Sequence, residues 1–235
     1  MGTRRVELQP AYVLHRHPYR DTSLLVEAFT RDHGRVGLVA RGAKRPRSAM
    51  AGLLQPFHPL LVSFSGKGEL QTLAGAEPHG RASVPRGRDL YAGFYLNELL
   101  LRLLRRHDAC PELFEVYAAV LGHVAAGDDV EWALRLFERH LLDALGYGLS
   151  LLYTVEGVPV EPGEWYRYQL ENGPVPGERG DGVAVTGRAL LALASGEAPD
   201  AEAREQSKRL LRAALRVYLG DRPLQSRELY RQTLR

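Results

Sequence analysis

The first 80 residues of the chain carry short apolar segments separated by turn residues. The segments rich in leucine, β-branched or aromatic residues are Tyr12–Leu14, Leu24–Phe29, Val36–Ala40, Leu60–Phe64 and Leu70–Leu73. Glycine and proline lie between them, as is typical of turns that connect strands. Because closure removes unpaired edge strands, these segments predict a small closed β-barrel rather than an open sheet.

After Pro85 the apolar positions change to a helical period. The pattern predicts a helix from about Leu90 to Arg105, a second that begins at Pro111, and a third over about Val130–Leu145 that ends at Gly146. Proline is accepted at the first position of a helix, and glycine commonly follows the last. Further helices are predicted over Thr186–Leu193 and Ala201–Leu219, with a last short helix after Pro223.

Between the third and fourth helices lies a segment rich in glycine and proline, with short β-like pieces at Leu151–Val155 and Tyr166–Leu170. The patterns together predict an α+β protein. Residues 1–80 are expected to form a β domain, and residues 81–235 a mainly α-helical domain with an irregular insertion at about residues 147–187.

The composition excludes several classes of protein. At 235 residues and 45% hydrophobic content the chain can bury a core. No apolar run is long enough for a membrane helix or a signal peptide, so we expect a cytoplasmic protein. The single cysteine, Cys110, excludes an internal disulfide and a multi-cysteine zinc site. No cofactor motif, nucleophile elbow or carboxylate pair with suitable spacing occurs, and we expect no catalytic activity.

Positive charge is concentrated in the first third of the chain. The net charge of the whole chain is +3, whereas residues 1–80 hold eleven lysines and arginines against six acids. A basic cluster follows the third apolar segment and contains Arg41, Lys44, Arg45 and Arg47. Positive charge on a short-stranded sheet without a catalytic motif points to a surface for a polyanion. The alternative is an ordinary solvated face.

Several stretches resemble the RecO family of bacterial recombination mediators. They are Ala11–Pro46, Leu54–Glu77, Tyr95–Leu104, Leu134–Tyr147 and Arg222–Tyr230, in register over nearly the whole chain. The resemblance implies an N-terminal OB-fold joined to a helical domain. It also implies binding of single- and double-stranded DNA, strand annealing, and loading of the RecA recombinase onto DNA covered by single-strand-binding protein. The acidic C-terminal tail of that protein and the mediator RecR are the partners it implies.

The chain departs from the family pattern in the insertion. Many relatives carry a four-cysteine zinc site there, whereas residues 149–176 contain no cysteine. We therefore expect no zinc, and expect Tyr153, Val155, Trp165, Tyr166 and Tyr168 to hold this segment by packing.

An OB-fold commonly binds nucleic acid with its binding face and with its first and fourth-to-fifth loops. The first loop is expected to hold Arg16, Tyr19 and Arg20, and the loop after the third strand the basic cluster. The predicted DNA-binding residues are Arg16, Tyr19, Arg20, Arg35, Arg41, Lys44, Arg45 and Arg47. Tyr19 can either stack on a base or cover the end of the barrel. Phe29, Phe57 and Phe64 are expected in the core.

A second basic set lies on the helix predicted over Ala201–Leu219. Its members are Lys208, Arg209, Arg212 and Arg216. With Leu211, Leu215 and Leu219 opposite, this helix could frame a groove for the acidic partner tail, or it could be a core helix with a solvated basic back. Two rival functions stay open: a protein-only adaptor without DNA contact, and a nuclease.

Overall fold

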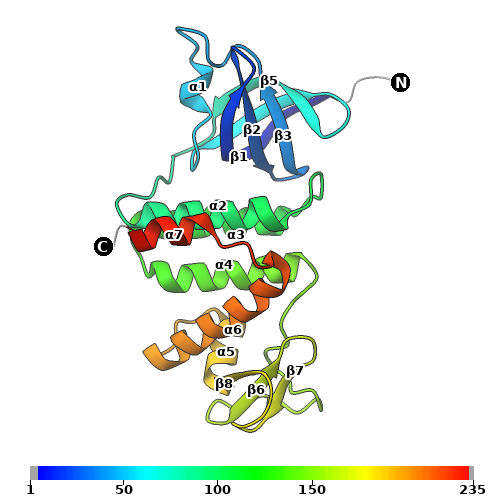
Figure 1. Ribbon diagram of the computed structural model, residues 1–235, viewed down its shortest axis with the longest axis vertical. Helices are drawn as coiled ribbons and strands as arrows, with labels where there is room; N and C mark the ends of the chain where they lie inside the picture. Colours follow the sequence, from blue (N-terminus) through cyan, green and yellow to red (C-terminus); the bar gives the residue numbers. More distant parts are fainter. Residues whose placement is uncertain (1–4, 233–235) are drawn as a thin grey trace. The chain divides into compact units, whose positions relative to one another are not determined.

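The computed structural model describes residues 5–232, which form two compact units (Figure 1). The first unit contains residues 5–128 and 223–232, and the second contains residues 129–222. The chain therefore leaves the first unit after Asp128 and returns to it at Pro223.

The first unit begins with a closed barrel in the strand order β1-β2-β3-β5-β4. The strands are β1 (Arg5–Tyr19), β2 (Ser23–Thr30), β3 (Gly34–Ala40), β4 (Pro59–Ser65) and β5 (Leu70–Pro78). All pairs are antiparallel except β3 with β5, and β1 pairs with both β2 and β4 to close the sheet. This is the OB-fold topology, and it confirms the predicted five-stranded barrel.

Alternate residues of the strands fill the barrel. Val26, Val36, Leu38, Val62 and Phe64 are among the side chains at its centre, each no more than 1% exposed. Strand periodicity of 2 explains this, because successive side chains point to opposite faces. The prediction that the three phenylalanines belong to the core is confirmed: Phe29 and Phe57 are also buried, although they lie outside the barrel cluster.

Two features of the barrel differ from the sequence prediction. The first strand is much longer than Tyr12–Leu14, because register shifts near Val6 and Val13 let it bend from one partner strand to the other. A one-turn helix, α1 (Met50–Leu53), follows the basic loop and was not predicted. So short an element has no periodic signature.

Three helices complete the first unit: α2 (Asp89–Leu103), α3 (Pro111–Ala126) and α7 (Gln225–Gln232). The fully buried Asn97 of α2 joins them to the barrel. Its amide donates to the Leu14 carbonyl of β1 at 3.0 Å, and its carbonyl accepts from the Tyr117 hydroxyl of α3 at 2.7 Å. Pro111 stands at the start of α3, as predicted.

The second unit contains α4 (Val130–Ala144), α5 (Gly187–Ser195), α6 (Ala201–Leu219) and a three-stranded sheet in the order β7-β6-β8. The strands are β6 (Trp165–Gln169), β7 (Gly173–Pro176) and β8 (Val183–Thr186). Asp129 caps α4 by accepting from the Trp132 amide, and Asp200 caps α6 in the same way from Ala203. The predicted bounds of α6 are confirmed.

The insertion is more regular than the sequence indicates. Leu151–Val155 forms no strand and contributes only an isolated bridge between Tyr153 and Pro159, whereas β7 and β8 were not predicted. Tyr166 and Tyr168 are buried as expected. The prediction that Tyr153 and Val155 hold the segment by packing is wrong, because they are 55% and 45% exposed on a loop tip.

Residues 5–232 lack two kinds of feature. No helix there is long and apolar enough to cross a membrane. No group of three or more histidine, cysteine, aspartate or glutamate side chains there is placed to hold a metal ion.

Candidate nucleic-acid interface

Two loops meet at one end of the barrel. The β1–β2 turn contains Arg20, Asp21 and Thr22, and the loop from Arg41 to Ala49 joins β3 to α1. The amide of Lys44 donates to the carbonyl of Thr22 at 2.9 Å, and Leu24 pairs with Ala40 in the ladder beneath. The two basic loops that the sequence separates by some twenty residues therefore form one surface.

This surface carries five exposed cations, which we call the basic cluster: Arg20, Arg41, Lys44, Arg45 and Arg47. Within residues 5–232 none of their side chains forms an ion pair with an acid. Asp21 is the acidic residue on the two loops. Like charges gathered without internal neutralisation attract an anion from outside the molecule.

Local backbone geometry fixes this arrangement. Gly42 has φ of +70°, and Arg45 folds back so that its side chain lies over it. Arg20 and Arg47 also take left-handed conformations, with φ of +52° and +69°. Glycine adopts such a φ without a steric penalty, whereas each arginine bears a cost that the turn must offset.

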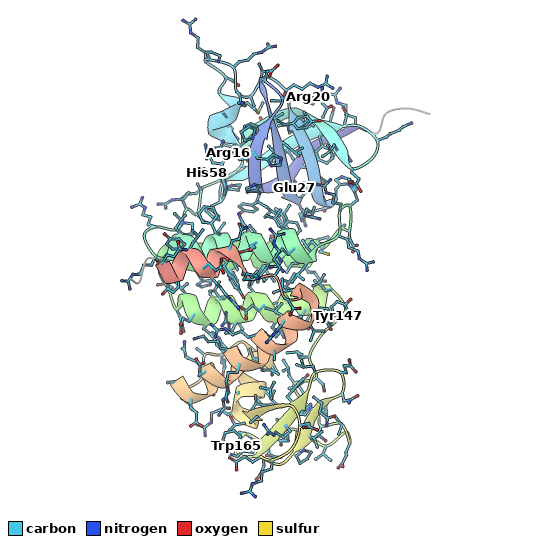
Figure 2. The ribbon with its side chains drawn as sticks, viewed as in Figure 1. Arg16, Arg20, Glu27, His58, Tyr147 and Trp165 are labelled. Carbon is cyan, nitrogen blue, oxygen red and sulfur yellow. The ribbon has the colours of Figure 1, made fainter. Side chains whose placement is uncertain are left out.

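Tyr19 and Arg16 lie beside the cluster in different roles. The guanidinium carbon of Arg20 lies 5.3 Å from the centre of the half-buried Tyr19 ring, a cation–π contact. Arg16 belongs to β1 rather than to a loop, and its guanidinium donates to the Ala51 carbonyl at 2.6 Å. Arg16 therefore anchors α1, and Figure 2 shows it beside that helix.

Arg35 lies away from the cluster, at the start of β3. It pairs with Phe29 at one end of the β2–β3 ladder, whereas Ala40, next to the cluster, lies at the other end. Its guanidinium donates to the Leu101 carbonyl at 2.8 Å and lies 3.8 Å from the carboxylate of Glu27. Glu27 is also paired with Arg106. Burial, opposed by Glu27, lowers the pKa of Arg35. Figure 2 shows Glu27 and Arg20 at different ends of the barrel.

Close backbone contact holds Arg35 in this place. Gly34 has φ of +62°, and a Cβ there would meet the Asp108 carbonyl oxygen at 1.9 Å. The His107 amide donates to the Arg35 carbonyl at 3.0 Å. Only glycine fits so close to the Asp108 backbone. The next residue, Arg35, therefore directs its guanidinium at Glu27 and Leu101.

The basic residues of α6 differ in their contacts. Lys208 pairs with Glu205 at 3.2 Å, while Arg209 donates to the Ala184 carbonyl of β8 at 3.2 Å. Arg212 and Arg216 are exposed. Leu211 and Leu215 are at most 1% exposed, so they belong to the core of the second unit and do not form the floor of an open groove.

Lys208 instead borders a small cavity of about 130 Å³ between α4 and α6, whose lining includes Trp132, Arg135 and Arg204. Arg204 makes two hydrogen bonds to Asp129, at 2.6 and 2.7 Å, and its guanidinium lies 5.9 Å from the centre of the Trp132 ring. These bonds, with burial opposing them, lower the pKa of Asp129. Sequence reasoning missed Trp132, Arg135 and Arg204, because they come from two helices whose pairing no local pattern reveals.

Comparison with known proteins decides the family. The sequence profile described as "Recombination protein O N terminal" matches residues 5–81, and the one described as "Recombination protein O C terminal" matches residues 86–228. The chain belongs to the RecO family. The resemblance drawn from the sequence is thereby confirmed.

Full-length relatives support the same assignment. DNA repair protein RecO of Alkalilimnicola ehrlichii is 53% identical over 240 residues, covering 100% of this chain and 95% of the relative. Those of Nitrosococcus oceani and Methylococcus capsulatus are 53% and 50% identical, covering 98% and 97% of this chain and 95% of each relative. The chain is therefore a DNA repair protein of the RecO family.

Proposed function

We propose that this member of the RecO family binds single- and double-stranded DNA through the basic cluster, anneals complementary strands, and helps to load RecA onto DNA covered by single-strand-binding protein. The observation that carries the proposal is the joining of two loops that present five exposed cations without ion-pair partners among residues 5–232. A cluster of this kind recognises phosphate and not base sequence, as annealing of any two complementary strands requires.

The chemistry of the surface sets the expected binding behaviour. Each cation that contacts a phosphate releases counterions, so affinity falls as salt rises. Tyr19, half-buried beside Arg20, can add stacking on a base worth about 1–3 kcal/mol. We assign Arg16 to supporting α1 and Arg35 to its contacts with Glu27 and Leu101, and a variant of Arg35 tests this assignment. The proposed role is electrostatic and architectural, without catalysis, at the DNA of the nucleoid.

The test compares two variants with equal loss of charge. In the first, Arg41, Lys44, Arg45 and Arg47 are replaced by alanine. In the second, four exposed arginines outside the two loops are replaced: Arg81, Arg86, Arg88 and Arg105. Binding to labelled oligonucleotides is measured by fluorescence anisotropy over a salt series, and annealing is measured with single-strand-binding protein present.

We expect the first variant to lose most of its affinity and to flatten the log–log salt dependence by about three units on single strands. The second variant should retain both properties. Equal losses in the two variants would mean that total charge and not the cluster controls binding. Full binding by the first variant would exclude the cluster and place the DNA site elsewhere on the chain. No binding by the unchanged chain at any salt would favour the protein-only adaptor.

For the partner we propose that the cavity beside Trp132 receives the acidic, aromatic-ended tail of single-strand-binding protein. Trp132 supplies an aromatic wall, and the cations Arg135, Arg204 and Lys208 line the cavity together with two acids, Glu131 and Glu205. Each cation has an acidic partner within the protein, which an acidic peptide would have to displace or share. Tail-peptide binding should fall at least tenfold in Lys208→Glu and stay unchanged in Arg216→Glu, an exposed cation of the same helix outside the cavity. RecR and RecA remain partners implied by the family.

A further inference from the structure

The second unit contains a larger groove that the proposed function does not use. It has a volume of about 680 Å³, and its walls come from the turn after α4, the β6–β7 turn, the segment just before β8 and the last turns of α6. Its lining includes two aromatic side chains, two acidic ones and an apolar one: Tyr147, Tyr218, Glu171, Asp181 and Val217.

Two stacked tyrosines form one wall of the groove. Tyr147 and Tyr218 have ring centres 3.9 Å apart and planes inclined by 15°, yet each remains two-fifths exposed. The end of α4 fixes the position of Tyr147. Gly146 takes φ of +80°, its amide donates to the Asp143 backbone carbonyl, and the amide of Tyr147 donates to the Leu142 carbonyl. This is the Schellman ending of a helix, which holds the residue after glycine rigidly. Figure 2 shows Tyr147 near the end of α6.

The remaining walls are acidic. Glu171 lies in the β6–β7 turn and Asp181 precedes β8, and both are exposed. Within residues 5–232 neither carboxylate forms an ion pair, and the lining contains no lysine, arginine or histidine. Desolvation is the main cause that raises the pKa of Tyr218, and electrostatic repulsion from Tyr147 and Glu171 raises it further. The Glu171 carboxylate lines the same groove as the stacked pair.

We propose that this groove docks an arginine-bearing extended segment of a protein partner. A guanidinium is planar, stacks on the face of a tyrosine, and donates two parallel hydrogen bonds to a carboxylate, so it matches both walls at once. Val217, which is 61% exposed, offers apolar surface for the methylene stem. The proposal does not depend on DNA binding by the first unit.

Charge distinguishes this occupant from the others. A DNA phosphate or an acidic tail would be repelled by Glu171 and Asp181, which have no cation beside them in the lining. In a chain with a net charge of +3, a groove whose lining holds two carboxylates and an aromatic wall is complementary to a cationic peptide. A lysine would satisfy the charge, but it would lose the planar stacking contact.

The experiment measures binding of a fluorescein-labelled peptide of alternating arginine and leucine to the full chain. Its matched control is the same peptide with citrulline in place of arginine, which keeps the planar shape but removes the charge. We expect the arginine peptide to bind at least tenfold more tightly than the citrulline peptide. Binding should fall at least tenfold in Glu171→Gln with Asp181→Asn, and also in Tyr218→Ala.

A second double variant, Glu161→Gln with Glu197→Gln, removes two exposed acids of the same unit outside the groove. It should bind the arginine peptide like the unchanged chain, and thermal unfolding should show that all variants are folded. Equal binding of both peptides, or equal loss in both double variants, would overturn the proposal. So would concentration-dependent self-association that the groove variants abolish, because the occupant would then be the basic loop of a second copy.

Discussion

The backbone amide of Lys44 donates a hydrogen bond to the carbonyl oxygen of Thr22 at 2.9 Å. This bond joins the loop after β3 to the turn after β1, and it places Arg20 on the same surface as the later basic residues. Because it uses only backbone atoms, the joining of the loops depends on backbone conformation and not on which side chain residue 44 carries.

The first prediction concerns the conformation of that loop. Gly42→Ala keeps every charge but places a Cβ at φ of +70°, which costs about 1 kcal/mol. We expect a several-fold weaker affinity for single-stranded DNA in anisotropy titrations. Gly80→Ala is the control, because its φ is +79° in open space within the linker before α2. Equal weakening in both variants would show that strain alone, and not loop position, lowers affinity.

The second prediction separates Arg35 from the basic cluster. Glu27→Gln leaves Arg35 and Arg106 half-buried beside a neutral partner, and we expect the free energy of unfolding to fall by about 2 kcal/mol in urea titrations. Arg35→Ala should also destabilise the fold while leaving the salt dependence of DNA binding unchanged. A flatter salt dependence in Arg35→Ala would instead identify Arg35 as a phosphate contact.

The third prediction concerns the attachment of α7. The carboxylate of Glu98 accepts from the amides of Gln225 and Ser226, each at 2.9 Å, and from the Ser226 hydroxyl at 2.7 Å. Glu98→Ala removes all three bonds and should lower the free energy of unfolding by about 1–2 kcal/mol. Hydrogen exchange should speed up over residues 225–232 before it does in the barrel. Uniform acceleration over the whole first unit would contradict this local role.

The fourth prediction concerns alkaline pH. Desolvation, opposed by a Ser150 backbone contact, raises the pKa of Tyr168 to about 12 from its ordinary value of 10. The neutral form is thus favoured in the folded state, so this contribution to stability is fully present below pH 10 and is lost between pH 10 and 12. The expected loss is at most about 1.4 kcal/mol per pH unit.

Tyr168→Phe provides the control for this titration, because phenylalanine fills the same space without an ionisable group. Its unfolding free energy, followed by denaturant titration at each pH, should decline less steeply than that of the unchanged chain between pH 10 and 12. Identical slopes would mean that Tyr168 does not control alkaline unfolding.

Local patterns predicted most of the elements. Short apolar segments bounded by turn residues placed β2, β3, β4 and β5, and helical periodicity with glycine and proline boundaries placed α3, α4 and α6. The patterns failed where an element is very short, as in α1, or where strands are held by partners across an irregular segment, as in β7 and β8. In such segments long-range pairing and not local preference decides the conformation.

The interpretation of individual charged residues shows the same limit. Glu98 and Arg102 are spaced like an ion pair on a helix surface, yet Glu98 caps α7 and Arg102 donates to the Pro223 carbonyl from a distant part of the chain. Arg35 and Arg41 look alike in sequence, but one is half-buried against Glu27 and the other is exposed. Residue spacing reveals neither difference, because each depends on which distant segment packs against the side chain.

The sequence by itself determined the barrel, the helices, the family and the excess of positive charge in the first third, because these follow from periodicity, composition and similarity along the chain. Only the tertiary structure decided which charges act together. It joined Arg20 to the loop after β3, turned Arg35 toward Glu27, and brought Tyr147 against Tyr218 at an acidic groove. The physical reason is that a charge or a ring acquires its role from neighbours a few ångströms away, which chain folding and not chain order supplies.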